Sequence, residues 1–220
     1  MIRFLTLLAT ALLPLAACGG SSSAADDTTN ANGIPDTARS LVVAGGCFWC
    51  VEKDFESRPD VYEAISGYAG GDNRDATYRN HEGHREVVEV YYDPSKTSYA
   101  ELVHFFLRTI DVTDDGGQFC DRGHAYTTAI HYLTDEEREA AEAAVAEAET
   151  ALGEEVVTAI EPLPFFVKAE DYHQDYYKSD DTIPTRFGLV KKKDAYKRYR
   201  KGCGRDARVR EVWGDAAATH

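Results

Sequence analysis

The sequence predicts an α+β fold, a single domain in which strands and helices pack in layers. Segments with strand-like alternation and segments with helical spacing follow one another without strict alternation, which favours an α+β sandwich over a doubly wound parallel sheet. The composition, 43% hydrophobic and 11% aromatic, is typical of a globular protein. A chain of 220 residues, even after removal of a front end, is long enough for one domain with a substantial core.

The front end is expected to lie outside this domain. Residues 1–17 begin with Arg3, continue with an apolar stretch too short to span a bilayer and end in small residues, the pattern of a secretory signal peptide. The junction at the end of this segment reads Leu15-Ala16-Ala17-Cys18-Gly19. That run resembles a bacterial lipobox, so Cys18 is the predicted lipidation site, with cleavage at an ordinary small-residue site as the alternative. Residues 18–38 would then be a lipidated N-terminus and flexible tether, and residues 39–213 the catalytic domain.

Compartment and charge limit the partners. A lipid on Cys18 would anchor the protein to a membrane in the cell envelope, facing the periplasm, without a spanning helix. The formal net charge of -14 argues against nucleic acid as a partner. Basic residues nevertheless concentrate in residues 186–210, which hold eleven Lys or Arg against two Asp. Because the rest of the chain is acidic, we expect this segment to bind back onto the protein itself.

The first predicted elements are a strand, a tight turn and a helix around two cysteines. The apolar residues 41–44 stop at Gly45 and Gly46, after which apolar positions recur at helical spacing, at Phe48, Val51 and Phe55. Cys47 would then lie in the first helical turn, where unpaired N–H groups and the helix dipole favour an anion. We expect its pKa to fall below the ordinary ~8.5. Cys47 is therefore a candidate nucleophile.

The spacing of Cys47 and Cys50 suits a redox pair, a structural disulfide or half of a zinc site, and spacing alone leaves all three open. The neighbours Phe48 and Trp49 favour catalysis, because only one of two adjacent aromatic side chains at a helix start points easily into the core. The other would line a pocket. One of the five cysteines is Cys18, and the remaining four are Cys47, Cys50, Cys120 and Cys203. Outside the cytosol these form two static bridges or a working set that needs a reducing partner.

The next elements follow from alternation, caps and breakers. Residues 61–68 are predicted to form a strand that ends in a glycine-rich loop at residues 67–71. Residues 85–92 are β-branched and aromatic with interleaved Glu, a strand that the following Asp-Pro terminates. Ser98 and Glu101 form a capping box for a helix whose apolar face is Leu102, Phe105, Phe106 and Ile110.

The second half is predicted to be less regular. A long loop at residues 111–124 precedes a strand at residues 126–133. Thr134 and Glu137 form a second capping box for an Ala/Glu-rich helix that ends near Gly153. A last strand is expected at residues 155–161, followed by a helix-like segment at residues 169–177 and the basic tail that carries Cys203.

Several short motifs occur between about residue 41 and residue 177. They are Gly46-Cys47-Phe48-Trp49, the Gly67-Tyr68-Ala69-Gly70-Gly71 loop with Thr77-Tyr78, Gly83-His84-Arg85-Glu86, Tyr91-Tyr92-Asp93-Pro94, Asp121-Arg122-Gly123 with Tyr126, and Ala169-Glu170-Asp171-Tyr172-His173-Gln174. In this order and at these spacings they resemble the peptide methionine sulfoxide reductase A family. The resemblance implies a ferredoxin-like α/β sandwich, or plait, with a long, less regular C-terminal extension.

The resemblance also implies an activity and a set of roles. It implies stereospecific reduction of methionine-S-sulfoxide, free or in proteins, and hence repair of oxidised proteins in the cell envelope. The family's nucleophile corresponds to Cys47 and its proton-donating carboxyl to Glu86. Its aromatic pocket corresponds to Phe48 and Trp49, its hydrogen-bonding tyrosines to Tyr78 and Tyr126, and its supporting acid to Asp121.

This chemistry explains the residue types. A sulfoxide sulfur is a poor electrophile because oxide would have to leave, so an acid must protonate the oxygen as the thiolate attacks. Glu86 can be that acid only if an apolar surround raises its pKa from ~4.3. Trp49 offers the methyl group an apolar slot and the growing positive charge a π face, worth ~0.5 to 2 kcal/mol. Attack leaves Cys47 as a sulfenic acid, which a second thiol can convert to a disulfide.

The sequence leaves the resolving thiol open among three cysteines. Cys203 is slightly favoured because the family usually places its resolving cysteine near the C-terminus. Cys50, where many members have glycine, comes second because it lies three residues from Cys47, and Cys120 comes third because it adjoins Asp121. An external thioredoxin-like thiol reductant would regenerate the enzyme. We expect no cofactor and no metal, and a monomer.

Two other functions remain as alternatives. A thioredoxin-like disulfide oxidoreductase would have a thioredoxin fold with a cis-proline facing the cysteine pair, and no proline begins a strand in a suitable place. A zinc-stabilised surface lipoprotein would bind its metal through Cys47, Cys50, Cys120 and His124.

Overall fold

The structure is a computed structural model that describes residue 29 and residues 33–186 and 188–219. The predicted signal peptide, the lipidation site Cys18 and most of the predicted tether lie outside the described residues. The end of that tether, residues 33–38, packs against the body instead: the side chain of Ile34 is only 3% exposed, and the Ala38 N–H donates to the Pro35 carbonyl at 2.9 Å.

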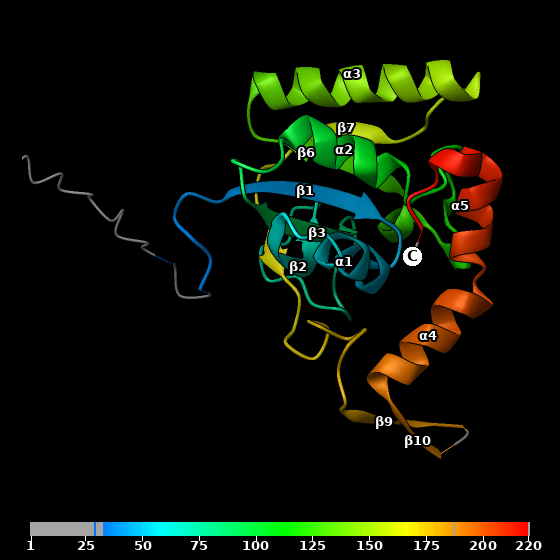
Figure 1. Ribbon diagram of the computed structural model, residues 1–220. Helices are drawn as coiled ribbons and strands as arrows, with labels where there is room; N and C mark the ends of the chain where they lie inside the picture. The colour runs from blue at the N-terminus through cyan, green and yellow to red at the C-terminus, as the bar shows by residue number, and fades with distance from the viewer. Residues whose placement is uncertain (1–28, 30–32, 187, 220) are drawn as a thin grey trace, which may run out of the picture.

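A six-stranded sheet forms the centre of the described structure, in the order β7-β6-β1-β3-β2-β8 (Figure 1). Its strands are β1 (Arg39–Gly45), β2 (Val61–Ala69), β3 (Arg85–Tyr92), β6 (Thr128–Tyr132), β7 (Ala159–Pro162) and β8 (Val167–Lys168). Neighbouring strands are antiparallel except β6 and β7, which are parallel. The inner order β6-β1-β3-β2, with a helix after β1 and another after β3, is that of a ferredoxin-like plait. The predicted fold class is confirmed.

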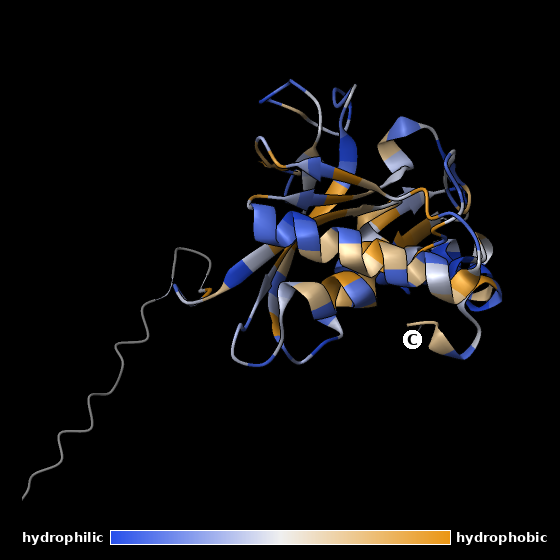
Figure 2. Cartoon of the chain, turned by 90° about the horizontal axis from the view of Figure 1, so that it is seen from above, coloured by the Kyte–Doolittle hydropathy of each residue, from blue (hydrophilic) through white to orange (hydrophobic). Residues whose placement is uncertain are grey.

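Three helices cover one face of the sheet. They are α1 (Phe48–Glu56), α2 (Tyr99–Leu107) and α3 (Asp135–Leu152). The rings of Phe55 and Phe106 join α1 to α2 with centroids 6.5 Å apart, and Leu41 and Val43 of β1 belong to the same core. Helix α3 lies outside α2 and buries only alanines, Ala141, Ala144 and Ala148 (Figure 1). Figure 2 shows hydrophobic residues along the strands between the helices, and hydrophilic residues in the outer loops.

Local signals set the helix ends. Both halves of the first predicted capping box are present, since Ser98 accepts from the Glu101 N–H and Glu101 accepts from the Ser98 N–H. In the second box Thr134 accepts from the Glu137 N–H, but the Glu137 carboxylate takes the N–H of Leu133, one residue earlier than expected. Helix α3 ends at Gly153, whose left-handed φ of 68° suits glycine.

The segment at residues 169–177, expected to be helix-like, forms consecutive turns. Asp175 has a φ of 56°, which a right-handed helix cannot contain. The Gln174 side chain donates to the carbonyl of Ser66 at 3.0 Å, which ties these turns to β2. The strand expected at residues 155–161 begins later, at β7, and the strand expected at residues 126–133 is shortened to β6 because residues 124–126 form a short 3-10 helix.

The C-terminal extension is more regular than expected. It contains a hairpin of β9 (Thr182–Thr185) and β10 (Gly188–Lys191), then helices α4 (Lys192–Gly202) and α5 (Arg205–Trp213), which run back along the body (Figure 1). Arg200 meets Asp54 of α1 at 2.9 Å, and Arg208 meets Asp111 at 2.7 Å. The expectation that the basic segment binds back onto the protein is confirmed. No described helix has the length and apolar character needed to cross a bilayer.

Candidate active site

A pocket of about 90 Å³ lies where β1 turns into α1. It is lined by Cys47, Phe48, Trp49, Tyr78, Glu86, Asp121, Tyr126 and Tyr199. Every residue predicted from the sequence to act in catalysis or to bind substrate is in this set. They come from the start of α1, from β3 and the segment before it, from the two-residue strand β5 (Asp121–Arg122) and from the 3-10 helix at residues 124–126. Tyr199, from α4, was not predicted. The fold therefore gathers residues that lie up to 152 positions apart, from Cys47 to Tyr199, around one small cavity.

The β1–α1 turn places Cys47. Gly46 has a φ of 81°, and a Cβ at that position would lie 2.6 Å from the Cβ of Gln118, so both conformation and space require glycine. Cys47 is the residue that caps the start of α1. Its carbonyl accepts the Cys50 N–H at 3.0 Å, which closes the first turn of the helix. The helix prediction is confirmed, with Cys47 at the N-cap.

Glu86 projects from β3 to the start of the same helix. The Phe48 N–H donates to its Oε2 at 3.0 Å, and its side chain is 2% exposed. Burial raises the pKa of this carboxyl to about 8, although the Phe48 N–H opposes the rise, and the charges of Asp121 and Cys50 add to it. At neutral pH Glu86 is therefore mostly protonated and can donate a proton. The raised pKa expected from the sequence is confirmed.

The lowered pKa expected for Cys47 is wrong for this structure. Burial raises the pKa of the Cys47 thiol well above its ordinary value; the hydrogen bond to Cys50 and the charges of Cys50 and Glu86 raise it further, and a hydrogen bond from Tyr199 lowers it. Cys47 is only 7% exposed, so desolvation outweighs the helix terminus. The first free N–H of the helix, that of Phe48, is occupied by Glu86 instead of the sulfur.

Two aromatic side chains form one wall of the pocket. Phe48 is 1% exposed and also belongs to the main core, whereas Trp49 is partly exposed. The Trp49 ring stacks on Tyr176 with centroids 3.8 Å apart and planes 9° apart. The expected division between a core aromatic and a pocket aromatic is therefore partial, because both rings line the cavity. Behind them lies His173, whose ring centroid is 4.9 Å from that of Phe48.

The predicted tyrosines stand together across the pocket. The hydroxyls of Tyr78 and Tyr126 are hydrogen-bonded to each other. Burial raises the pKa of both phenols, so they remain neutral hydrogen-bond donors at any physiological pH. The main chain at Tyr78 is fixed by Glu170, whose Oε1 accepts the Tyr78 N–H at 3.1 Å. The pair can orient an oxygen atom that enters the cavity.

The unpredicted Tyr199 links the C-terminal extension to the nucleophile. Its hydroxyl lies between the carboxyl of Asp121, to which it donates, and the thiol of Cys47, with which it also hydrogen-bonds. A phenol carries one proton, so it can donate to only one of them at a time. Burial raises the pKa of Asp121, and the Tyr199 hydrogen bond opposes that rise. One sequence signal could have pointed to Tyr199. It precedes Cys203 by four residues, so on a helix the two side chains lie on the same face.

The cysteines divide into two pairs. Cys120 and Cys203 form a disulfide with a Cα–Cα distance of 5.2 Å. Cys47 and Cys50 are free and buried, and their side chains are hydrogen-bonded to each other. The proposed zinc set is wrong, since Cys120 is already committed to a disulfide. Within the described residues, the acidic group with ligand-like spacing is Glu52, Glu56 and Asp175, and these carboxylates already bind Ser66, Tyr177 and Lys178.

The sequence is similar to known proteins. The sequence model for "Peptide methionine sulfoxide reductase" matches residues 39–215. The chain is 51% identical over 178 residues to peptide methionine sulfoxide reductase MsrA 2 of Rhizobium meliloti (strain 1021), covering 80% of this chain and 84% of that protein. It is 41% identical to peptide methionine sulfoxide reductase MsrA 2 of Caulobacter vibrioides, covering 97% and 100%.

Solved structures of methionine sulfoxide reductase A and of Mxr1 superpose on this fold. Reduced Mxr1 from Saccharomyces cerevisiae superposes with a TM-score of 0.61 at 28% identity, over 64% of this chain and 85% of that one. Methionine sulfoxide reductase A of Corynebacterium diphtheriae superposes with a TM-score of 0.58 at 28% identity, over 70% and 84%. The plait and these matches show that the thioredoxin-like alternative was wrong. The chain belongs to the peptide methionine sulfoxide reductase family.

Proposed function

We propose that this chain reduces methionine-S-sulfoxide, free or in proteins, to methionine by thiol chemistry at Cys47. One observation carries the proposal: a buried, largely protonated Glu86 carboxyl and the Cys47 thiol line the same small cavity, beside the aromatic wall of Phe48 and Trp49. The relatives from Rhizobium meliloti and Caulobacter vibrioides are named as reductases of methionine sulfoxide, which supports the same substrate. Specificity for the S-epimer is part of the proposal.

The pocket suggests how the sulfoxide would be held. Its methyl group would rest against Trp49, and its oxygen would meet the carboxyl of Glu86 and the hydroxyls of Tyr78 and Tyr126. The sulfoxide sulfur is chiral and carries a methyl group, an oxygen and a long side chain. Because the apolar wall and the hydrogen-bond donors lie on different sides of the pocket, only one configuration at sulfur fits. This arrangement is the basis for the proposed stereospecificity.

The first step transfers oxygen from substrate to enzyme. As Glu86 delivers its proton to the sulfoxide oxygen, the Cys47 sulfur attacks the sulfoxide sulfur and the sulfur–oxygen bond of the substrate breaks. The hydroxide released then adds to the Cys47 sulfur and the transient bond between Cys47 and the substrate sulfur breaks, so methionine leaves and Cys47 becomes a sulfenic acid. The proton given up by the Cys47 thiol restores Glu86. The substrate sulfur is reduced by two electrons and the Cys47 sulfur is oxidised by two.

The second step restores the thiol. The Cys47 sulfenic acid condenses with a second cysteine, releasing water and forming an intramolecular disulfide. An external thioredoxin-like dithiol would then reduce that disulfide, provided its reduction potential is lower. The cycle needs only thiols and a proton donor, so no metal or prosthetic group enters it.

We also propose that the enzyme repairs oxidised proteins in the cell envelope, facing the periplasm from a membrane. Support for this comes from the sequence of residues 1–18 alone, in which Cys18 is the acceptor of the lipid. Expression of the full chain with labelled fatty acid should label the wild type and leave Cys18→Ser unlabelled, with the variant moving from the membrane fraction to the soluble fraction. Equal labelling of both proteins would end this part of the proposal.

The decisive experiment is an assay of both epimers of methionine sulfoxide with a dithiol reductant. Wild type should reduce the S-epimer and leave the R-epimer intact, and Cys47→Ser should reduce neither. A matched control is the Cys120→Ser/Cys203→Ser double variant, which also replaces cysteines with serine but changes no residue that lines the pocket. Turnover by Cys47→Ser, or consumption of the R-epimer at a comparable rate, would contradict the proposed function.

A further inference from the structure

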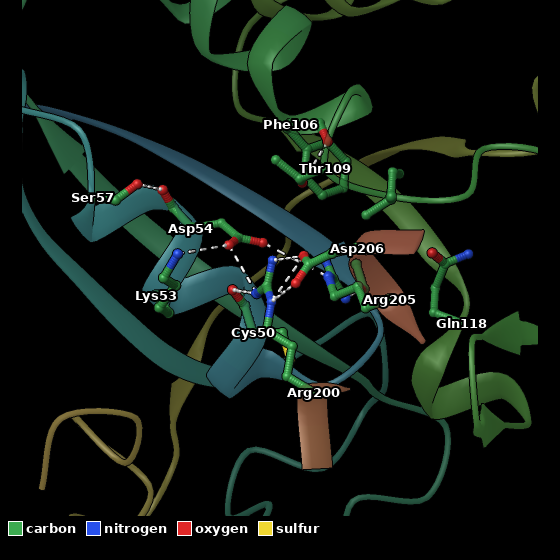
Figure 3. A network of polar contacts seen from close by, with 12 residues as sticks. Cys50, Lys53, Asp54, Ser57, Phe106, Thr109, Gln118, Arg200, Arg205 and Asp206 are labelled. Atoms are coloured by element: carbon green, nitrogen blue, oxygen red, sulfur yellow. Dashed lines mark hydrogen bonds and ion pairs between the residues drawn. The ribbon is translucent and has the colours of Figure 1, made fainter. Parts of the chain in front are cut away.

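A buried cluster of charges lies beside Cys50, one of the two free cysteines (Figure 3). Its centre is Asp54 of α1, whose side chain is completely buried. Arg200 of α4 approaches it with Nη1 at 2.9 Å from Oδ1, and Arg205 of α5 with Nε at 3.7 Å from Oδ2. Figure 3 shows both guanidinium groups converging on Asp54, with Cys50 beside them. The two basic helices therefore bring positive charge into the interior at the start of α1.

The cluster has more cations than anions. Lys53 lies 3.8 Å from Asp54, and Asp206 binds Arg200 at 2.7 Å. Three cations thus face the two carboxylates of the cluster. A third carboxyl, that of Asp121, also interacts with Arg205, and burial raises its pKa. Within the described residues, Nε and Nη2 of Arg205 have no hydrogen-bond acceptor, although this side chain is 1% exposed. A buried cation without full compensation is costly, so one further negative charge nearby would stabilise the cluster.

Cys50 is the ionisable group placed to supply that charge. It sits in the first turn of α1, is 2% exposed, and its carbonyl accepts from Arg200 Nη1 at 3.4 Å. Burial alone raises the pKa of the Cys50 thiol, but the hydrogen bond from Cys47 and the positive charges of Arg205 and Arg200 more than offset this, against the charge of Asp54. The net effect lowers the pKa of Cys50.

The other groups near Cys50 do not compete for this role. Burial raises the pKa of the phenols of Tyr196 and Tyr199, so both stay neutral. Glu86 is mostly protonated below a pKa of about 8. The Cys47 thiol has the opposite shift to its neighbour, so the hydrogen-bonded pair is polarised, with the proton on Cys47 and the negative charge on Cys50.

The Cys120–Cys203 pair holds the segment that carries Arg200 and Arg205. The Cys120–Cys203 disulfide joins the loop before Asp121 to the end of α4. Cys203 lies three residues after Arg200 and two before Arg205, so the bridge anchors the chain between them. While it is intact, neither Cys120 nor Cys203 is a free thiol. Cys50 is then the remaining free cysteine in the described chain besides Cys47.

We propose that Cys50 is the thiol that resolves the Cys47 sulfenic acid, that Arg200 and Arg205 stabilise its thiolate, and that the Cys120–Cys203 bridge holds those arginines in place. The proposal rests on the proposed function and deepens it. The Cys50 thiolate attacks the sulfur of the sulfenic acid, a Cys47–Cys50 bond forms, and the sulfur–oxygen bond breaks. The departing hydroxide takes the proton of Glu86 and leaves as water. Cys50 is oxidised as the sulfenic sulfur is reduced.

Geometry permits this bridge with little movement. Side chains three residues apart in a helical turn have Cβ atoms about 5 to 6 Å apart, and a disulfide needs about 3.5 to 4.5 Å. The side chains of Cys47 and Cys50 are already in hydrogen-bonding contact. Cys47 is the N-cap, outside the regular helix, so a small change there closes the gap. The sequence had favoured Cys203 slightly; this proposal puts Cys50 first.

The first test is a single turnover, with one equivalent of methionine sulfoxide, of protein in which Cys47 and Cys50 are reduced and the Cys120–Cys203 bridge is intact, followed by alkylation and mass-spectrometric mapping of disulfides. Wild type should contain a Cys47–Cys50 bridge. Cys120→Ser/Cys203→Ser should form the same bridge more slowly, because its arginines are no longer held by the Cys120–Cys203 disulfide. Cys50→Ser should release one equivalent of methionine and then accumulate a sulfenic acid that dimedone traps. A bridge from Cys47 to Cys120 or Cys203 in the wild type would overturn the assignment of Cys50.

The same experiment separates the two proposals. If no form releases methionine, the proposed function fails. If methionine is released but Cys50→Ser loses its sulfenic acid as fast as the wild type, only the role of Cys50 fails. The methionine yield also shows that each variant is folded and competent in the first step.

The second test concerns the arginines, by the pH dependence of sulfenic acid loss after the methionine burst. Arg200→Gln should shift the profile to higher pH, and a shift of about one unit makes resolution about tenfold slower at neutral pH. Arg200→Lys, which keeps the charge, should retain most of the rate. The matched control is Arg208→Gln, which removes an ion pair with Asp111 from an exposed position on α5 and should leave the profile unchanged. Superimposable profiles for Arg200→Gln and wild type would refute the arginine role.

A third measurement avoids substitutions in the cluster. In Cys18→Ser/Cys47→Ser protein with the Cys120–Cys203 bridge intact, the ultraviolet absorbance of the thiolate should report ionisation of Cys50 alone. We expect a midpoint below the ordinary thiol value of ~8.5. A midpoint at or above that value would show that the arginines do not stabilise the thiolate.

Discussion

The main-chain N–H of Phe48 donates a 3.0 Å hydrogen bond to Oε2 of Glu86. This contact ties the proposed acid, on β3, to the helical turn that carries Cys47. The positive end of α1 therefore meets the Glu86 carboxyl, while burial raises the pKa of the Cys47 thiol. The result is a site in which both groups hold protons at rest, and approach of a sulfoxide must draw the proton from Glu86.

Glu86→Gln tests the acid and its effect on stability. Loss of the proton donor should lower the rate of the first step by roughly 10²- to 10⁴-fold, measured as the methionine burst. The raised pKa of Glu86, about 8 against an ordinary 4.5, means that its stabilising contribution is complete below pH 4.5 and is lost as pH rises through about 8. Glutamine stays neutral, so urea unfolding of the variant should show a weaker fall in stability across this window, by on the order of a few kcal/mol.

Glu52 provides the internal control for that measurement. Burial raises its pKa to about 8 as well, opposed by hydrogen bonds from Ser66 and the Asp175 main chain. The Glu86→Gln variant should therefore keep part of the pH dependence of the wild type. If both proteins unfold with the same pH dependence, Glu86 is not protonated in the folded state at neutral pH.

Trp49→Leu tests the aromatic face. Leucine keeps the slot apolar but removes the π face, so turnover should fall by a factor of about 2 to 30, the equivalent of ~0.5 to 2 kcal/mol. The control is Tyr176→Phe, which keeps the ring that stacks on Trp49 at 3.8 Å. Steady-state rates with methionine sulfoxide report both. Unchanged turnover in the leucine variant would remove the cation–π contribution.

Tyr199→Phe tests the contribution of the C-terminal extension to the nucleophile. The Tyr199 hydrogen bond lowers the pKa of Cys47, so its loss should make the thiol harder to ionise. A hydrogen bond of ~0.5 to 1.5 kcal/mol corresponds to a methionine burst that is roughly 2- to 12-fold slower. Tyr172→Phe, which loses only an exposed hydrogen bond to Glu170 at 3.3 Å, is the control. Equal slowing of both variants would indicate a general effect instead.

Gly46→Ala tests the turn before the nucleophile. The residue has a φ of 81°, and the new Cβ would lie 2.6 Å from the Cβ of Gln118. We expect a loss of stability of about 1 to 3 kcal/mol from the backbone alone, seen by urea unfolding. The control is Gly202→Ala, at the end of α4, where a Cβ meets no atom within 4 Å and should be neutral or stabilising. A neutral Gly46→Ala would mean that the turn relaxes freely.

Cys120→Ser/Cys203→Ser tests the bridge. The disulfide spans 83 residues, so its removal should cost about 2 to 5 kcal/mol of unfolding free energy. Urea unfolding of the double variant against the oxidised wild type measures the loss, and reduced wild type is the control that should match the variant. Identical stability of oxidised and reduced wild type would show that the bridge does not hold the extension in place.

The sequence by itself determined the features that depend on neighbouring residues or on compact motifs. The capping box of Ser98 and Glu101, the left-handed Gly153 and the turn at Gly46 follow from local conformation. The strands β1, β2, β3 and β6 and the helices α1 and α2 follow from periodicity. The family motifs pointed to the residues around the pocket.

Only the tertiary structure decided features that depend on distant parts of the chain. The pKa of Cys47 is raised because protein from several elements encloses it, and no local pattern records that burial. Residues 169–177 form turns because their side chains bind β2 more than 100 residues away, as the Gln174–Ser66 contact shows. Tyr199, the Cys120–Cys203 bridge and the arginines behind Cys50 reach the site only through the packing of α4 and α5. Desolvation and ion pairing sum over spatial neighbours, and those neighbours are set by the fold.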